Sequence, residues 1–355
     1  MQSSSQKFRT IEWNDGVVIL LDQTKLPAKE NYLQISDVDG LVRAIKRLSV
    51  RGAPAIGVAG AYGVALAARQ FPPAKKPKEF AAAIEQIRTA RPTAVNLEKR
   101  VTETMAAINR SSDSPADAAL RAAHAIREEE LQSSTEMGER GAYAVLDLCG
   151  GGPITAMTIC NTGGLATVER GTALAVIQTL HELGHLAEAI PLETRPLLQG
   201  GRLTTWELQR MGANYRLIVD SAGPFLLSRG AADVVLIGAD RIAANGDTAN
   251  KIGSYSLALG AREAGVPFIV VAPESTVDFE TATGAEIKIE DRGPLEVTSI
   301  QGHEIATAGS TAINPAFDVT PARLITAIVT EARVVRLDRG ETLDPVDSLR
   351  REEIE

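Results

Sequence analysis

The spacing of hydrophobic residues changes along this chain. From about residue 41 to residue 130, apolar side chains recur at helical intervals, as at Leu41, Ile45 and Leu48. Such spacing predicts a succession of helices. Ahead of it, residues 16–22 (GVVILLD) form a short apolar run that predicts a strand. The first third of the chain is therefore predicted to be mainly helical.

Beyond residues 150–153 (GGGP), short apolar runs alternate with helical patterns. This alternation is typical of βα units around a parallel sheet. The predicted strands are residues 154–160, 186–191, 215–220, 234–238 and 268–272, and the predicted helices lie near residues 172–183, 203–211, 222–229 and 251–264. The predicted fold class is α/β: a small mainly helical N-terminal domain, residues 1–130, and a Rossmann-like C-terminal domain with a parallel sheet, residues 131–355.

Each predicted strand of the second region runs into a loop of small and polar residues. The loops are CNTGG (160–164), ETRP (193–196), DSAG (220–223), GADR (238–241) and APEST (272–276). In open α/β sheets, ligands bind at the carboxyl ends of the strands. We therefore expect these five loops to converge on one site.

Composition and charge restrict the class of protein. With 44% hydrophobic and 23% charged residues among 355, the chain is expected to fold around a core rather than stay disordered. The net charge of −8 argues against nucleic acid or an anionic membrane as a partner. The longest uncharged run, residues 52–68, is short for a membrane span, and the N-terminus lacks the apolar segment of a secretory signal. A cytoplasmic protein with two reduced cysteines is expected.

Several familiar motifs are absent or unconvincing. His181 to His185 spell H-E-x-x-H, but Gly184 is predicted to end the helix between the two histidines, so no metal is expected. The glycines of GVAGAYG (57–63) follow no clear strand and predict close helix packing rather than a dinucleotide site. Neither a P-loop nor a Gly-x-Ser-x-Gly motif occurs.

Two residues at predicted strand ends are candidates for chemistry. Cys160 precedes a glycine-rich turn and a helix, a place where an anion or a reacting atom would lie, whereas Cys149 belongs to an apolar stretch and is expected to be an inert core thiol. Asp240 ends the run VVLIGAD, and from its position alone an acid and a structural cap or ion-pair partner are equally good interpretations.

Basic residues beside small ones suggest an anionic ligand. Asn250 and Lys251 are predicted to begin a helix whose free N–H groups would hold a phosphate, and Arg51-Gly52-Ala53-Pro54 offers a second site of the same kind. Arg91 and Arg195 add further positive charge next to small residues. Together these segments predict a small phosphorylated molecule as the ligand.

Six segments, in order between about residues 41 and 331, carry a family resemblance. They are RGAPAIGVAGAYG (51–63), RPTAVNL (91–97), TICNTGGLAT (158–167), ETRPLLQGGRLT (193–204), IGADRIAANGDTANKIGSYSLA (237–258) and NPAFDVTP (314–321). They closely resemble the methylthioribose-1-phosphate isomerases. That family is related to the regulatory subunits of the eukaryotic translation-initiation guanine-nucleotide exchange factor.

The resemblance implies an enzyme of methionine salvage that converts an aldose 1-phosphate into a ketose 1-phosphate, as a homodimer without metal or nucleotide cofactor. Matched motif by motif, Cys160 and Asp240 would be the catalytic pair. The residues that would bind substrate are Arg51, Gly52, Ala53, Arg91, Gln199, Asn250 and Lys251. Asp240 would need a raised pKa to act as an acid, and Cys160 would either take a proton from C2 or assist a hydride shift.

Two alternatives stay open beside this interpretation. A sister isomerase would act on 5-deoxyribose 1-phosphate or ribose 1,5-bisphosphate, because the loops at residues 164–170 and 220–225 depart from the family pattern. A 5-phosphate would require additional cations, and the sequence assigns none. A non-catalytic regulatory protein of the initiation-factor type would be expected to lack the cysteine and aspartate pair, which this chain has.

Overall fold

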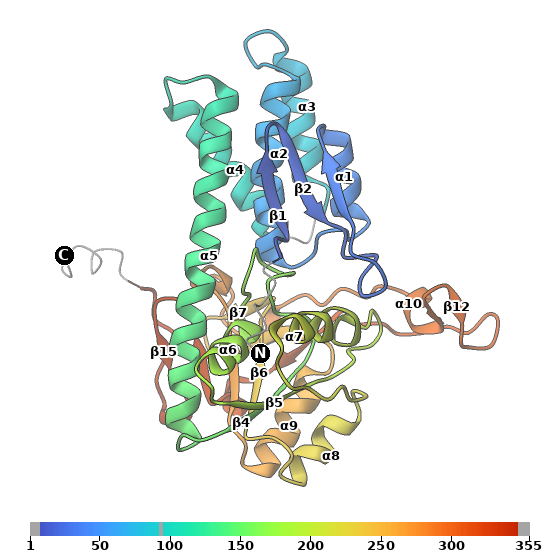
Figure 1. Ribbon diagram of the computed structural model, residues 1–355, viewed down its shortest axis with the longest axis vertical. Helices are drawn as coiled ribbons and strands as arrows, with labels where there is room; N and C mark the ends of the chain where they lie inside the picture. The colour runs from blue at the N-terminus through green and yellow to red at the C-terminus, as the bar shows by residue number, and fades with distance from the viewer. Residues whose placement is uncertain (1–7, 92–94, 347–355) are drawn as a thin grey trace.

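The computed structural model describes residues 8–91 and 95–346. Its upper part begins with a three-stranded antiparallel sheet, β1 (Ile11–Asn14), β2 (Val17–Leu21) and β3 (Tyr32–Ile35). Five helices follow: α1 (Val38–Lys46), α2 (Ala53–Gln70), α3 (Pro77–Arg88), α4 (Val95–Arg110) and α5 (Pro115–Leu148), as Figure 1 shows. The predicted strand at 16–22 and the predicted helices are confirmed, whereas β1 and β3 were not predicted.

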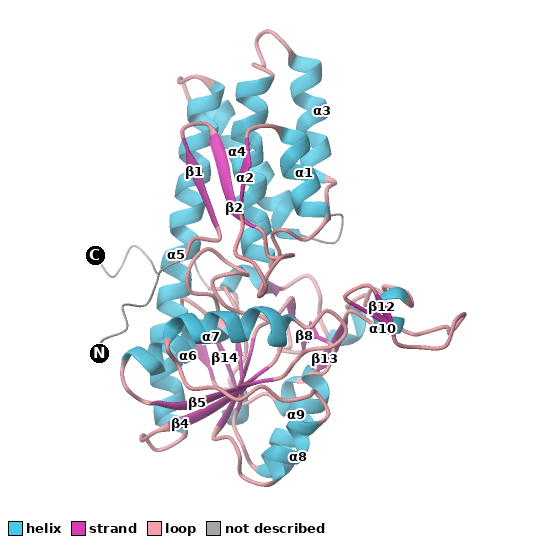
Figure 2. Cartoon of the chain, turned by 45° about the vertical axis from the view of Figure 1, so that its right-hand side comes forward, coloured by secondary structure: helices cyan, strands magenta, loops and turns pink. Residues whose placement is uncertain are grey.

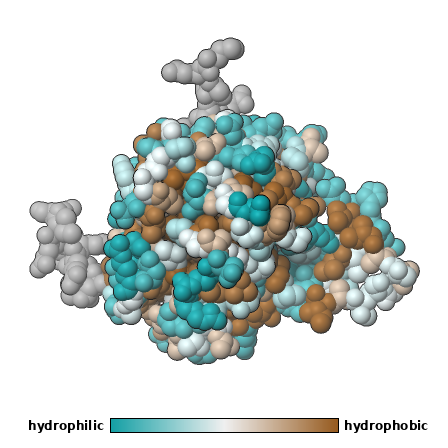
Figure 3. Space-filling model, turned by 90° about the horizontal axis from the view of Figure 1, so that it is seen from below, coloured by the Kyte–Doolittle hydropathy of each residue, from teal (hydrophilic) through white to brown (hydrophobic). Residues whose placement is uncertain are grey.

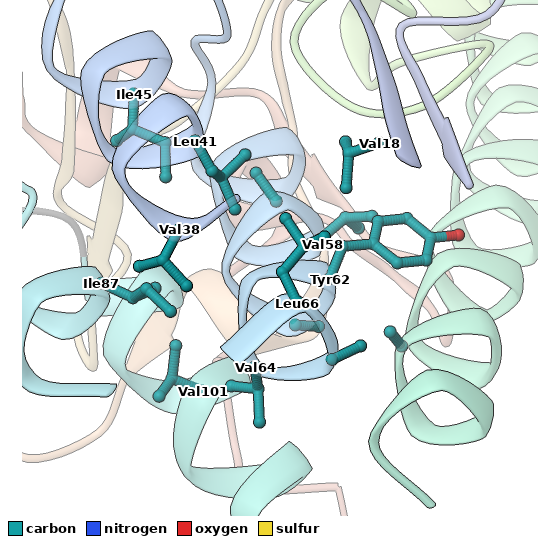
Figure 4. Close-up of a cluster of buried hydrophobic side chains, with 14 of the residues drawn as sticks. Val18, Val38, Leu41, Ile45, Val58, Tyr62, Val64, Leu66, Ile87 and Val101 are labelled. Carbon is teal, nitrogen blue, oxygen red and sulfur yellow. The ribbon is translucent and has the colours of Figure 1, made fainter. Parts of the chain in front are cut away.

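The helix α2 forms the centre of the upper core. Its side chains are buried almost throughout because α1, α3, α4 and α5 surround it. Figure 4 shows Tyr62 and Leu66 of this helix among Leu41, Ile87 and Val101. A Cβ atom at Gly60 would lie 2.6 Å from Leu97 Cδ1, so the glycines of this segment allow close helix packing, as predicted.

The helix α5 joins the upper part to the lower part. Its first half packs against α2 and α4, and its second half packs against α6 (Ala173–Glu182) of the lower part (Figure 1). The helix continues without interruption through residue 130, where the sequence predicts the domain boundary.

A six-stranded sheet organises the lower part. The strand order is β15-β14-β9-β6-β4-β5. All neighbouring strands are parallel except β14 and β15, which are antiparallel. The strands are β4 (Ile154–Thr158), β5 (Leu186–Pro191), β6 (Val234–Ile237), β9 (Phe268–Val271), β14 (Ala327–Val329) and β15 (Val334–Val335). Helices α5, α6 and α7 (Thr205–Met211) cover one face, while α8 (Ala222–Ser228) and α9 (Ser254–Ala264) cover the other (Figure 2). The chain is therefore a mixed α/β protein with a largely parallel sheet.

Two predicted elements are wrong in part. Residues 215–220 do not form a strand, because only isolated bridges link Tyr215 and Ile218 to the edge of the sheet beside β5. The helix predicted from residue 251 begins at Ser254, and Asn250 and Lys251 instead end a strand.

That strand, β8 (Thr248–Lys251), forms a hairpin with β7 (Arg241–Ala243). The hairpin belongs to a second sheet of order β10-β7-β8-β13, in which β10 is Val277–Asp278 and β13 is Phe317–Thr320. The turn contains Asn245-Gly246, and Gly246 has a φ of +88°. Asn-Gly between two extended segments is a hairpin signal, so the sequence did carry this information.

A short arm projects from the lower part (Figure 2). It carries α10 (Leu295–Thr298) and the two-stranded pair β11 (Ser299–Ile300) and β12 (His303–Glu304). Across residues 8–91 and 95–346, none of the helices is both long and apolar enough to cross a bilayer.

Candidate functional site

The predicted catalytic pair follows two neighbouring strands of the main sheet. Thr158 at the end of β4 pairs with Leu236 of β6, and Cys160 and Asp240 follow these two strands directly. From β4 the chain passes to β5 on one side, while β6 lies on the other side of β4. A crevice forms where strand order reverses in this way, and it is the usual ligand site of an open α/β sheet.

Cys160 is held by hydrogen bonds from both sides of its peptide. Its backbone N–H donates to Thr194 Oγ1 at 2.8 Å, and its carbonyl oxygen accepts from Thr204 Oγ1 at 2.6 Å. The residue is 8% exposed and has a φ of +67°, a conformation rare outside glycine. Arg51 Nη2 lies 3.7 Å from the sulfur atom. The guanidinium group thus places a positive charge beside the sulfur atom.

Four of the five predicted loops meet around Cys160. The ETRP loop contacts the cysteine through Thr194, whose own N–H donates to the Asp220 carboxylate of the DSAG loop at 2.7 Å. In the GADR loop, a Cβ atom at Gly238 would lie 2.9 Å from Thr162 of the CNTGG loop. The APEST loop has no such contact with Cys160 among those described, and its Glu274 instead contacts Glu331 and Arg333, which follow β14.

Asp240 stands between β6 and the β7–β8 hairpin. Its N–H donates to Ala249 O at 2.9 Å, so the hairpin brings the aspartate next to the end of β8 and Lys251. Desolvation by the surrounding protein raises the pKa of the Asp240 carboxyl group, while the positive charges of Lys251, Arg51 and Arg91 oppose that rise. The residue is still exposed to solvent, so protein atoms crowd the carboxyl group without closing it off. Such a carboxyl group can hold a proton and remain within reach of a ligand.

Lys251 and Asn250 are buried in the second sheet. Lys251 Nζ donates to Ala316 O at 2.7 Å and lies 4.5 Å from the centre of the Phe317 ring. Burial lowers the pKa of Lys251, against the opposing influence of Cys160 and Asp240. Asn250 Nδ2 donates to Ser254 Oγ at 2.8 Å. Both residues lie at the site, but on a strand.

The phosphate site predicted at the start of the following helix is therefore wrong. The first N–H groups of α9 are already bound, because Gly253 N and Tyr255 N donate to the carboxylate of Asp318 at 2.7 and 3.1 Å. This carboxylate occupies the place that an anion would take at a helix N-terminus. An anion near Lys251 has to be held by side chains instead.

Arg51, Gly52 and Ala53 lie at the start of α2, as predicted. Gly52 has a φ of +88°, and a Cβ atom there would lie only 2.2 Å from Ala166 O. Ala55 N donates to the same carbonyl oxygen at 3.2 Å. This contact fixes the start of α2 against the CNTGGLA segment and thereby places Arg51 beside Cys160.

Arg91 adds a further positive charge to the site. Burial and the neighbouring cations Arg292 and Arg51 lower its pKa. Arg292, which the sequence analysis did not single out, pairs with Glu296 at 2.6 Å near the base of the projecting arm. The next residues of the RPTAVNL motif, 92–94, lie outside the described residues.

Gln199 is 3% exposed, and its side-chain oxygen finds no hydrogen-bond partner within the described part of the chain. It precedes a π-helical turn, Gly200–Thr204, that leads into α7. A buried amide oxygen without a partner is costly, so a ligand hydroxyl group is a natural partner for it.

Sequence reasoning missed Asn161, Thr194 and Glu207. Asn161 and Thr194 lie inside two of the quoted motifs, so attention to every polar residue of a strand-end loop would have found them. Glu207 lies on α7 and belongs to none of these segments. It is fully buried, and its Oε1 accepts from Asn161 Nδ2 at 2.7 Å. Burial raises the pKa of Glu207 to about 7.

The remaining two candidates are the H-E-x-x-H segment and Cys149. The helix α6 ends at Glu182, and Gly184 with a φ of +76° separates the two histidines of the H-E-x-x-H segment. No cluster of three or more His, Cys, Asp or Glu side chains suited to a metal occurs among the described residues. The predicted core position of Cys149 is wrong, because the residue is half-buried at the C-terminal end of α5. Burial still raises the pKa of Cys149 to about 11, which keeps this thiol protonated at neutral pH.

Comparisons with known proteins identify the family of this chain. A model of the initiation factor 2 subunit family matches residues 49–336. A methylthioribose-1-phosphate isomerase of Nitrosococcus oceani is 47% identical, over 97% of this chain and 99% of its own length. The crystal structure of a 5-methylthioribose 1-phosphate isomerase from Pyrococcus horikoshii has a TM-score of 0.87 and 38% identity, over 95% of either chain. A structure from A. fulgidus described as translation initiation factor eIF-2B, subunit delta, has a TM-score of 0.84 and 39% identity, over 93% of this chain and 96% of its own.

Proposed function

We infer that this chain, which belongs to the methylthioribose-1-phosphate isomerases of the initiation factor 2 subunit family, converts 5-methylthioribose 1-phosphate into 5-methylthioribulose 1-phosphate. It is an aldose–ketose isomerase of methionine salvage. The observation that carries this conclusion is full-length similarity to isomerases, combined with a thiol and a crowded carboxyl group at the crevice between β4 and β6.

We propose that Asp240 is the acid of the reaction. The substrate carries its phosphate on the anomeric oxygen, so its ring does not open spontaneously as that of a free sugar does. Asp240 donates a proton to the ring oxygen, and the bond between C1 and that oxygen breaks. The raised pKa of Asp240 supports this role, because the carboxyl group has to be protonated before it can donate.

Cys160 completes the hydrogen transfer from C2 to C1 along one of two routes. As a thiolate beside Arg51, it takes the C2 proton and leaves an enol phosphate across C1 and C2. A proton then returns to C1, and loss of the proton from the C2 hydroxyl group gives the ketone. Alternatively, the C2 hydrogen moves to C1 as a hydride while the C2 hydroxyl group loses its proton. Deuterium placed at C2 separates the routes, because solvent exchange occurs only in the first.

The phosphate is held by cationic side chains. Arg51, Arg91 and Lys251 come from three separate segments, and their charges act on the same carboxyl group, Asp240. Cationic side chains of this kind bind phosphate oxygens through charge-assisted hydrogen bonds. Gln199, Asn250 and the backbone at Gly52 and Ala53 are proposed to bind the rest of the sugar phosphate.

Arg292 gives a specific reason to test a second substrate. Ribose 1,5-bisphosphate carries a second phosphate, and Arg292 is an additional cation close enough to lower the pKa of both Arg91 and Lys251. Its pairing with Glu296, however, already neutralises much of its charge. We therefore favour the methylthio sugar.

Turnover assays on the purified protein test the function. The protein should form ketose from 5-methylthioribose 1-phosphate with a kcat/KM well above those for 5-deoxyribose 1-phosphate and ribose 1,5-bisphosphate. Cys160→Ser and Asp240→Asn are the inactive controls. A preference for the bisphosphate would identify the sister isomerase, and absence of turnover on all three would favour a regulatory protein.

Activity is expected to survive prolonged EDTA treatment, since no metal takes part in the proposed steps.

We further propose that the enzyme is a cytoplasmic homodimer. Large hydrophobic side chains are exposed on the lower part, including Leu217, Val219, Phe225 and Leu259. Figure 3 shows hydrophobic residues on the surface seen from below. Burial of such residues against a second copy would be favourable.

The division into domains at residue 130 stays a prediction, since the two parts share α5.

A further inference from the structure

The orientation of the Asn161 amide group is set by what lies on either side of it. Its Nδ2 lies 2.7 Å from Glu207 Oε1, and its Oδ1 lies 3.4 Å from Arg51 Nη1. Arg51 can only donate hydrogen bonds, so the amide oxygen of Asn161 has to face Arg51. The NH₂ group is thereby directed at Glu207 Oε1, which also accepts from Leu165 N.

Arg51 connects this amide group to the reactive sulfur atom. While Nη1 faces Asn161, Nη2 of the same guanidinium group lies 3.7 Å from Cys160 Sγ. The guanidinium group is planar and rigid, so the position of one of its nitrogens restricts the other. A continuous chain of polar contacts therefore runs from Glu207 through Asn161 and Arg51 to Cys160.

Local packing holds the carboxyl group of Glu207 at the start of this chain. Leu165 N donates to Oε1 at 3.4 Å, and Thr204 Oγ1 lies 3.3 Å from Asn161 Nδ2. A Cβ atom at Gly163 would lie 2.3 Å from Glu207 Oε2, so the glycine of the CNTGG loop leaves the space that the carboxyl group occupies. Burying a carboxyl group here is costly, which calls for a compensating role.

We propose that Glu207 is a positioning residue of the isomerase, which orients Asn161 so that Arg51 stays beside the Cys160 sulfur atom. The expected effect on turnover rests on the proposed function, whereas the expected effect on the reactivity of the Cys160 thiol does not. Glu207 itself is only 2% exposed. It acts on the thiol through two other side chains, and its loss leaves Arg51 without a fixed acceptor.

The test measures thiol reactivity and turnover in the same full-length variants. In a Cys149→Ser background, iodoacetamide reports on Cys160 alone. Glu207→Leu, which removes the acceptor for Asn161 Nδ2, is expected to lower both the alkylation rate at pH 7 and kcat by about 10- to 100-fold, the usual range for loss of a supporting contact at a reactive group. Asn161→Leu should have an effect of similar size. In the double variant the second change should add less than about twofold, because both residues act through one chain of contacts.

The matched control is Glu130→Leu. Glu130 is another buried carboxyl group that bonds an arginine, Arg100 at 2.8 Å, but it lies between α4 and α5. This control should lower the urea midpoint and leave alkylation within about twofold of the parent. It thus separates general destabilisation from an effect on the thiol.

Three outcomes decide the proposal. Unchanged alkylation and kcat in folded Glu207→Leu would overturn it, and so would full additivity of the two changes. If Glu207→Leu does not fold, unchanged alkylation in Asn161→Leu would overturn it as well. A parent protein that fails to turn over methylthioribose 1-phosphate, yet shows the alkylation differences, would remove the proposed function and leave the positioning role in place.

Discussion

Replacing Gly52 by alanine perturbs the contact that fixes the start of α2. The new Cβ atom would lie 2.2 Å from Ala166 O and 2.6 Å from Ala166 Cα, and both belong to the backbone. Backbone atoms cannot swing aside as a flexible side chain does, so either α2 or the segment after Cys160 has to move. Such a shift would also break the hydrogen bond from Ala55 N to Ala166 O.

The expected cost follows from these two contributions. Gly52 has φ and ψ of +88° and 136°, outside the small left-handed region that other residues adopt, and such strain costs about 1–3 kcal/mol. Loss of the hydrogen bond adds about 0.5–1.5 kcal/mol. The free energy of unfolding should therefore fall by roughly 1.5–4.5 kcal/mol. Arg51 is the adjacent residue, so substrate affinity should fall as well.

Urea unfolding followed by circular dichroism measures the cost, and Gly265→Ala provides the control. Gly265 has a φ of +67° at the end of α9, and nothing lies within 4 Å of a Cβ atom there. Its replacement should cost only about 1 kcal/mol, the usual penalty of the left-handed region. Equal losses in the two variants would show that the contact with Ala166 contributes nothing and would refute the reasoning.

Four further predictions concern the site. Asp240→Asn keeps the shape of the side chain but removes the proton, so kcat should fall by about 10²- to 10⁴-fold while substrate still binds, and near-normal turnover would contradict its role. Arg51→Ala should weaken substrate binding by about 2–4 kcal/mol in calorimetry, and an unchanged Kd would remove it from the site. With a pKa of about 11, Cys149 is thiolate in only about one molecule in a thousand at pH 8, so peptide mapping after one equivalent of iodoacetamide should find the label on Cys160, with protection by substrate. Glu207 binds its proton more tightly in the folded state, because its pKa is raised from 4.5 to about 7. Its contribution to the free energy of unfolding should therefore fall by up to about 3 kcal/mol as pH rises through that interval. Glu207→Gln should lack this decline in urea unfolding, and parallel pH profiles of the variant and the parent would contradict the prediction.

The parallel sheet was predictable because buried strands are short apolar runs. Residues 186–191 were predicted with the observed bounds, and the cores of β4, β6 and β9 were found as well. The same apolar criterion failed for residues 215–220, where the chain lies along the sheet edge and forms only isolated bridges. A run of hydrophobic residues indicates that a segment is buried. A regular strand also requires a neighbouring strand to which it can hydrogen-bond along its whole length.

The second sheet was missed because its strands carry the polar residues of the site. The segment Thr248–Lys251 reads TANK, which has none of the β-branched or aromatic repetition typical of a strand, yet all four residues are buried. Tertiary contacts with β7 and β13 decide its conformation. Among the site residues, Cys160 and Asp240 were predictable because they follow apolar strands. Glu207 was not predictable, because its contact with Asn161 depends on the packing of α7 against the CNTGG loop.

The segment after Cys160 is held from both parts of the molecule, and this determines how the enzyme can be divided. From the upper part, Thr10 Oγ1 donates to Gly164 O and Gln23 Nε2 donates to Leu165 O, both at 2.6 Å. From the lower part, Thr204 binds the carbonyl group of Cys160. A fragment cut near residue 130 would carry the cysteine without half of its supports. The reactive centre is thus a property of the assembled chain, and neither part can be exchanged for that of a distant relative unless these contacts are transferred with it.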